Sequence, residues 1–131
     1  MNKIMRCALV SMMWMVAAPA YATEAWQAFN CQLEDDDKTE ADVVAAAKKW
    51  LKAARTMKGG EELRVSVHFP VAAAAADSDF KMILIAPTFA AWGTFWDGYE
   101  GSPAHKVDKE ADEITTCKES RLFDGVEIEV D

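Results

Sequence analysis

The sequence predicts an α+β domain whose elements follow the order strand, helix, strand, strand, helix, strand. Residues 25–33 and 80–86 are apolar runs of strand length with apolar side chains on both faces, a pattern typical of central strands. Two further stretches, residues 43–57 and 91–99, repeat apolar residues at the three- and four-residue spacing of a helix. Cys31 lies in the first strand, and Cys117 precedes the last one. A bond between these cysteines would place the first and last elements side by side.

The chain is predicted to begin with a cleaved signal peptide. Its features are a positively charged start, an apolar run of about a dozen residues, and small residues at Ala20 and Ala22, where a signal peptidase reads the chain. The alternative, an uncleaved membrane anchor, needs a longer apolar run to span a bilayer. We expect residues 1–22 to be removed, which leaves residues 23–131 as a single periplasmic or secreted domain with no membrane partner.

The charge balance argues against nucleic acid as a partner. Removal of the leader takes Lys3 and Arg6 from the 14 basic residues, so 12 remain against 22 acidic residues and the formal charge is −10. A surface this acidic repels a phosphate backbone. The run Asp35-Asp36-Asp37 could suggest calcium, but the spacing of an EF-hand loop and its distant Glu are missing. We interpret the run as a solvated turn and expect neither a metal nor a cofactor.

An exported chain that keeps two cysteines predicts one disulfide, between Cys31 and Cys117. The two residues are 86 positions apart, so in the chain-entropy model the bond would constrain the unfolded chain by roughly 4 to 5 kcal/mol, less any strain. Two free thiols are the alternative. A metal site is disfavoured because neither cysteine has a His or a third Cys at ligand spacing.

The first half of the chain predicts a strand over residues 25–33, then a helix and a second strand. Thr39 is expected to cap the helix with Asp42 as its capping-box partner. The apolar stripe of this helix continues to about Met57, and Gly59-Gly60 is expected to end it. Residues 63–69 then alternate between apolar and polar side chains, which indicates a half-buried strand. We expect a loop, or the flared end of a hairpin, over residues 71–76.

The second half predicts a central strand over residues 80–86, a helical crossover and a last strand. Thr88 is expected to cap a helix with an aromatic face. A further helical piece over about residues 104–114 would complete the crossover. The last strand is expected over residues 118–130, with a bulge at Gly125.

This element order is the split βαβ arrangement of ferredoxin-like folds. In that topology the antiparallel sheet has the strand order 4-1-3-2, both helices cover one face, and the last strand runs antiparallel to the first. Cys31 near the end of the first strand and Cys117 at the start of the fourth lie at ends that meet in such a pair. The disulfide and the topology are inferred from separate observations, and they agree.

The sequence resembles the dimeric α+β barrel superfamily, the group of antibiotic-biosynthesis-monooxygenase-like and NIPSNAP-like domains. Residues 91–96 (AWGTFW) are similar to the aromatic second helix of those domains, and residues 102–105 (SPAH) to their small-Pro-x-His segment. Length and element order match over most of residues 23–131. An export signal and a disulfide depart from those mostly cytoplasmic domains, and no catalytic constellation carries over.

The resemblance implies a homodimer in which each sheet covers the other and the pair forms a barrel. The residues themselves favour the same assembly. The first and third strands are apolar on both faces, whereas a monomer has helices for only one face.

Aromatic residues at helical spacing are the candidate lining of a small apolar ligand pocket: Trp50, Trp92, Trp96 and Tyr99. The alternative is that they are core residues. If the pocket exists, Asp97 and Tyr99 are expected to be its nearest polar groups.

His68 and His105 are the candidate catalytic residues, because a histidine can move a proton near neutral pH. Each also fits a surface position. The serines lie in contexts that suggest no nucleophile, and the disulfide leaves no cysteine free to attack, so hydrolase chemistry of the Ser or Cys type is unsupported.

Two functions fit these observations. The first is an exported, dimeric domain that holds a small apolar ligand without catalysis. The second is a cofactor-independent oxygenase or isomerase acting on an apolar or aromatic substrate, a hypothesis that rests on fold analogy alone. A histidine facing an enclosed cavity beside Trp92 and Trp96 would favour the enzyme, and histidines in solvent would favour the binding protein.

Overall fold

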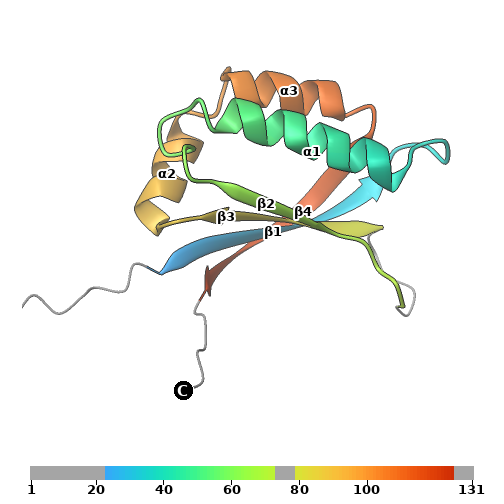
Figure 1. The fold of residues 1–131 in the computed structure, drawn as a ribbon, viewed down its shortest axis with the longest axis horizontal. Coiled ribbons are helices and arrows are strands. Elements are labelled where there is room, and N and C mark those ends of the chain that lie inside the picture. Colours follow the sequence, from blue (N-terminus) through green and yellow to red (C-terminus); the bar gives the residue numbers. More distant parts are fainter. Residues whose placement is uncertain (1–22, 73–78, 126–131) are drawn as a thin grey trace, which may run out of the picture.

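The computed structural model describes residues 23–72 and 79–125 and confirms the predicted order of elements. The crossover after the third strand consists of two short helices, the first at one end of the sheet and the second beside the first helix of the chain (Figure 1). The predicted signal peptide and most of the predicted 71–76 loop lie outside the described residues. The elements are β1 (Glu24–Leu33), α1 (Glu40–Ala54), β2 (Arg64–His68), β3 (Phe80–Ala86), α2 (Phe89–Asp97), α3 (Pro103–Ala111) and β4 (Thr115–Gly125).

The four strands form one antiparallel sheet in the order β2-β3-β1-β4, which is the predicted 4-1-3-2 order. The helices lie on one face of this sheet, as predicted, with α1 and α3 side by side above it and α2 at one end (Figure 1). The opposite face carries no element in the described part of the chain. The molecule therefore has two layers and one open sheet face.

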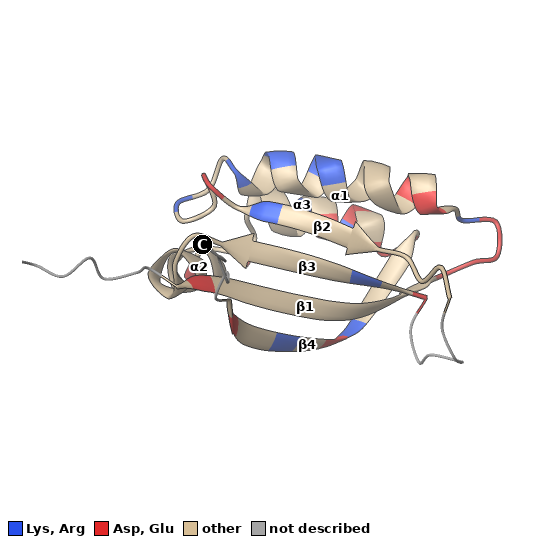
Figure 2. Ribbon diagram, turned by 60° about the horizontal axis from the view of Figure 1, so that its bottom comes forward, with Lys and Arg blue, Asp and Glu red and all other residues tan. Residues whose placement is uncertain are grey.

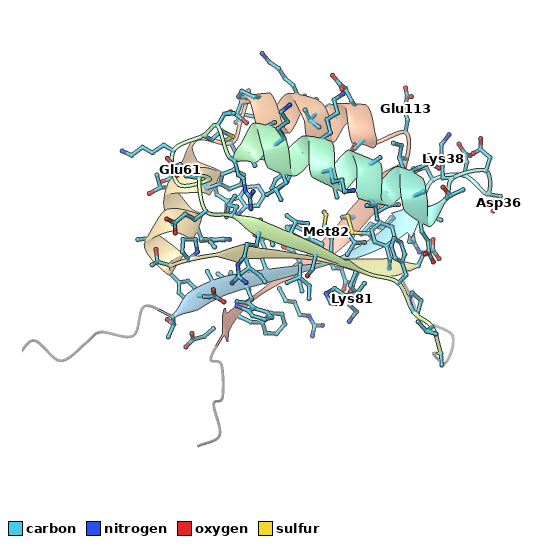
Figure 3. The ribbon with its side chains drawn as sticks, in the orientation of Figure 1. Asp36, Lys38, Glu61, Lys81, Met82 and Glu113 are labelled. Carbon is cyan, nitrogen blue, oxygen red and sulfur yellow. A yellow bond between two sulfur atoms is a disulfide. The ribbon has the colours of Figure 1, made fainter. Side chains whose placement is uncertain are left out.

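The core lies between these two layers. Side chains alternate along β3, so Leu84 and Phe80 point to the helices and are buried, whereas Lys81 is exposed. Figure 3 shows Met82 on the helix side of the sheet and its neighbour Lys81 on the other side. Phe95 of α2 is fully buried against the same face.

Helix α1 begins with the predicted capping box. The backbone N–H of Thr39 donates to Asp42 Oδ2 at 2.8 Å, and the N–H of Asp42 donates to Thr39 Oγ1 at 3.4 Å. The hydrogen bonds from the side chain and then the backbone of Thr39 hold the pKa of Asp42 below its ordinary value.

The end of α1 differs from the prediction, because the helix stops at Ala54 and not near Met57. The guanidinium of Arg55 donates two hydrogen bonds to the carbonyl of Leu63, at 3.0 and 2.8 Å. These bonds turn the chain back towards β2 through a series of turns in which Met57 is buried. Gly59, with a φ of +81°, lies within these turns and does not cap the helix.

Strands β1 and β4 pair along almost their whole length, with Cys31 directly opposite Cys117. The two cysteines form the predicted disulfide, and their Cα atoms are 4.0 Å apart. Strand β4 begins at Thr115, three residues before the predicted start, so Cys117 lies inside it. This pairing ties the first element to the last.

The predicted bulge at Gly125 is wrong. The register shifts between Asn30 and Cys31, where β4 carries Lys118 as an extra residue, and Gly125 pairs regularly with Glu24. A Cβ atom at Gly125 would lie 2.3 Å from the indole nitrogen of Trp26. The glycine therefore makes room for that side chain. Residues 126–130 of the predicted last strand lie outside the described residues.

Candidate functional site

A cavity of about 230 Å³ lies between the helices and the sheet. Its walls come from the inner face of α1, the helix side of the strands, and the residues around α3. Its lining residues are Phe29, Val43, Ala46, Ala47, Trp50, Val65, Phe80, Met82, Leu84, Trp96, Tyr99, Asp108, Ala111, Asp112, Thr115, Thr116 and Cys117.

Most of the cavity wall is apolar, and the sequence explains why space remains there. Helix α1 presents Val43, Ala46, Ala47 and Trp50 at helical spacing to the sheet. The two alanines are short, so α1 does not fill the volume above the strands. The disulfide residue Cys117 lines the cavity on the β4 side.

A hydrogen-bonded chain of three side chains forms the polar part of the cavity. The Nε1–H of Trp50 donates to Tyr99 Oη at 3.2 Å, and Tyr99 Oη donates to Asp108 Oδ2 at 2.8 Å. Burial raises the pKa of Tyr99 above its ordinary value. The bond from Trp50 lowers it in part, while the hydrogen bond to Asp108 and the charges of Asp108 and Asp112 raise it further. Tyr99 therefore stays a neutral phenol that donates a hydrogen bond to Asp108.

Aromatic rings pack against one another at this end of the cavity. The ring centroid of Trp96 lies 4.6 Å from the ring centroid of Tyr99 and 5.2 Å from that of Phe95. The ring of Trp50 meets Phe95 edge-on at 5.8 Å. The Nε1–H of Trp96 is buried and has no hydrogen-bond acceptor among the described residues.

Three of the four predicted pocket residues meet at the cavity. Trp50, Trp96 and Tyr99 line it, whereas Trp92 does not belong to its lining. The Nε1–H of Trp92 donates to Gln27 Oε1 at 2.9 Å, so this indole belongs to the contact between α2 and β1. Asp97, the expected polar group beside Tyr99, is exposed and is absent from the lining.

Neither histidine lines the cavity. His68 is exposed on the open face of the sheet, where its Nε2 lies 2.9 Å from Ser66 Oγ. His105 lies at the start of α3, and its Nδ1 accepts a hydrogen bond from the N–H of Gly101 at 2.9 Å. Its ring packs against the Tyr99 ring at 5.4 Å. His68 thus lies away from the cavity, whereas His105 contacts the lining residue Tyr99 without lining the cavity itself.

Sequence reasoning missed Asp108 and Asp112, the two carboxylates at the cavity. The signal was present in α3. Ala104, Asp108 and Ala111 share one helix face, and Ala104 is fully buried, so the spacing places Asp108 on the cavity side of α3, although its side chain remains exposed.

The aspartate run at residues 35–37 is an exposed turn between β1 and α1, as predicted. Within residues 23–72 and 79–125, no group of three or more His, Cys, Asp or Glu side chains is placed to hold a metal ion. No helix in that part of the chain is long and apolar enough to cross a bilayer.

The open face of the sheet is a second surface with an apolar centre. Figure 2 looks onto this face and shows β1 and β3 almost free of charged residues, with charges gathered on β4 and at the strand ends. Trp26 and Phe123 face each other across β1 and β4, with 36% and 50% of their surface exposed. On the other side of β1, Ile85 of β3 pairs with Trp26, and Ile83 of β3 pairs with Ala28.

No family model matches the chain, and no curated protein matches it. Among solved structures, it is similar to a dimeric ferredoxin-like protein of unknown function from Thermobifida fusca, with 11% identity and a TM-score of 0.51 over 79% of this chain and 92% of that one. It is also similar to HapK from Hahella chejuensis, with 14% identity and a TM-score of 0.49 over 82% and 97% of the two chains. The first similarity and the strand order together show that the chain has the ferredoxin-like fold.

Proposed function

We propose that this chain is an exported, homodimeric domain that binds one small, mainly apolar molecule in the cavity between the helices and the sheet. The observation that carries this proposal is the cavity itself, with its aromatic wall and its polar cluster at Trp50, Tyr99 and Asp108. Apolar walls with a few placed polar groups are typical of small-molecule sites.

The cavity volume sets the size of the ligand. An apolar protein cavity of about 150 Å³ holds benzene, which has six non-hydrogen atoms. By that ratio the cavity of about 230 Å³ suits a molecule of roughly nine non-hydrogen atoms. One substituted aromatic ring has this size, and it matches the rings of Trp50 and Trp96 that would contact it.

The contacts of the candidate catalytic residues support binding over catalysis. An oxygenase or isomerase of the proposed type needs a proton-transfer group against its substrate. His68 and His105 lie away from the cavity lining, and Tyr99 is held as a neutral phenol. Asp108 and Asp112 line the cavity and could accept a proton, so an enzyme would have to act through them; the cavity itself carries the binding function that we propose.

The open sheet face supports the homodimer. Trp26, Ile83 and Phe123 form an apolar patch on a face that the chain's own helices do not cover. The similar structure from Thermobifida fusca is described as dimeric. Packing of two such faces would bury the patch in each copy. Export is supported by the predicted signal peptide and by the disulfide, since disulfides persist in oxidising compartments.

A nuclear magnetic resonance titration of residues 23–131 with 2-phenylethanol, which has the required size, tests the binding proposal. The four tryptophans of this segment give an internal control, because Trp50 and Trp96 line the cavity and Trp26 and Trp92 do not. We expect the indole N–H signals of Trp50 and Trp96 to shift and the other two to stay.

Matched variants sharpen this test. Ala47→Leu fills part of the cavity, and Ala45→Leu adds the same side chain to an exposed position of the same helix. We expect Ala47→Leu to weaken binding at least about tenfold and Ala45→Leu to leave it unchanged. Equal shifts of all four indoles, or equal binding by both variants, would contradict the proposed site.

A further inference from the structure

We propose that the ligand is a small apolar amine whose ammonium group lies at Tyr99, Asp108 and Asp112. This inference rests on the proposed function, because it names the chemical class of the molecule that the cavity would hold. Four features of the cavity support it: its carboxylates, the end of α3, its aromatic rings and its supply of hydrogen-bond acceptors.

The carboxylates give the cavity one sign of charge. Asp108 and Asp112 line it, and no Lys, Arg or His belongs to its lining in the described part of the chain. Neither aspartate forms an ion pair with a described residue, whereas the neighbouring Glu110 is paired with Lys49. Both side chains are exposed, so water screens their charges, but an anionic ligand would still meet two carboxylates without an ion-pair partner and a cation would be attracted by both.

The C-terminal end of α3 adds a partial negative charge to that of the two carboxylates. Ala111 and Asp112 line the cavity at the C-terminal end of this helix, where the aligned peptide dipoles give a partial negative charge. The C-terminal end of the helix thus lies at the cavity together with the two carboxylates.

Aromatic rings are the third feature. Trp50, Trp96 and Tyr99 surround the polar end of the cavity, and Phe29 and Phe80 belong to its wall. The face of an aromatic ring attracts a cation and repels an anion, because the π-electrons make that face negative. Rings combined with carboxylates are suited to an organic cation.

Most hydrogen-bonding groups at the cavity also favour a donor on the ligand, the exception being the buried Nε1–H of Trp96, which is itself a donor. Tyr99 donates a hydrogen bond to Asp108 and accepts one from Trp50, so its remaining capacity is as an acceptor. Asp112 makes no side-chain hydrogen bond to another described residue and is an acceptor as well. An ammonium group carries N–H donors for these oxygen atoms, and a carboxylate group carries none.

Three probes of nearly the same size and different charge test the inference: phenethylamine, 2-phenylethanol and phenylacetate. Their dissociation constants are measured from the indole signals of Trp50 and Trp96 at one pH and one salt concentration. We expect phenethylamine to bind at least about tenfold more tightly than 2-phenylethanol, and phenylacetate to bind most weakly.

The double variant Asp108→Asn/Asp112→Asn removes both charges, while the amide oxygen introduced at position 108 can still accept the bond from Tyr99. We expect it to bind phenethylamine only as tightly as 2-phenylethanol, with the alcohol's own affinity unchanged. Asp97→Asn removes a charge outside the cavity and should keep the preference for the amine.

The outcomes separate this inference from the proposed function. If the alcohol binds as tightly as the amine, or if the double variant keeps the preference, the charge inference is overturned and the binding site stands. If none of the three probes shifts the Trp50 and Trp96 signals, both fail.

Discussion

At the scale of single residues, the hydroxyl of Tyr99 connects two helices and sets the polarity of the cavity. It accepts from Trp50 of α1 and donates to Asp108 of α3, with distances of 3.2 and 2.8 Å. The ring is half-buried between Trp96 and His105. The hydroxyl is desolvated, which disfavours its charged form. It also faces a carboxylate, so its deprotonation would place two negative charges side by side.

This arrangement predicts how Tyr99 titrates. It is the one tyrosine in residues 23–131, so phenolate absorbance of that segment reports it alone. Burial raises its pKa above the ordinary value near 10, so we expect the midpoint in the folded protein to exceed that in denaturant. The linked stability is fully present below the unfolded pKa and is lost as the pH rises through the folded pKa. Equal midpoints in the two states would contradict the proposed hydrogen-bonded chain.

The identity of these contacts could be predicted only in part. Aromatic spacing pointed to Trp50, Trp96 and Tyr99, because such periodicity marks one helix face. It could not separate Trp92 from them, since the bond from Trp92 to Gln27 joins residues 65 positions apart. The carboxylate of Asp108 could have been placed on the cavity side of α3 from its spacing with Ala104 and Ala111, but its hydrogen bond to Tyr99 depends on how α3 follows α2.

At the scale of elements, the pairing of β1 with β4 holds the fold together. Cys31 and Cys117 bond across these strands, and Cys31 is fully buried in the smaller core cluster with Val43 and Phe80. Strand β4 forms an edge of the sheet, and most of its side chains are exposed. With little core burial of its own, β4 depends on its hydrogen bonds to β1 and on the disulfide.

Removal of this bond should therefore cost much of the stability. We expect Cys31→Ala/Cys117→Ala to lower the free energy of unfolding by about 3 kcal/mol, and the melting temperature by roughly ten to twenty degrees. Guanidinium unfolding of both proteins measures the difference. As a control, a reducing agent should destabilise the native protein and leave the variant unchanged. Equal unfolding free energies would show that the bond is not formed or not needed.

Local signals predicted the starts of the elements better than their ends. Thr39, Thr88 and Ser102 each cap a helix through a side-chain bond three residues on, and the first two were recognisable from sequence. The end of α1 depends on bonds from Arg55 to Leu63, eight residues away, which override the apolar stripe that continues to Met57. Gly125 likewise leaves space for the Trp26 side chain on another strand, a contact that the local sequence pattern cannot reveal.

At the scale of the whole molecule, the two faces of the sheet carry different features. The helix side encloses the cavity, and the open side carries the apolar patch proposed as the dimer interface. The apolar residues on both faces of β1 and β3 predicted a covered second face, and alternation along the strands places Ile83 and Trp26 there. The described residues leave that face uncovered, so the sequence could indicate the need for a cover but not its geometry.

Adjacent residues of β4 offer a matched test of the dimer. Phe123 points to the open face and Leu122 to the helix side, and they are 50% and 41% exposed. We expect Phe123→Asp to convert the dimer to a monomer, because the charge would be buried at the interface, and Leu122→Asp to leave a dimer. Light scattering at micromolar concentration measures both masses. A monomeric native protein, or two variants that behave alike, would contradict the proposed interface.

The central claim is that the cavity holds a small molecule, and native mass spectrometry tests it most directly. The native protein and Ala47→Leu are purified without reduction from the organism that makes the chain, and their intact masses are compared. We predict an oxidised dimer in which the native protein carries one small organic molecule per chain and the Ala47→Leu variant carries much less. A native protein with no added mass, or the same added mass in both proteins, would contradict a ligand in this cavity.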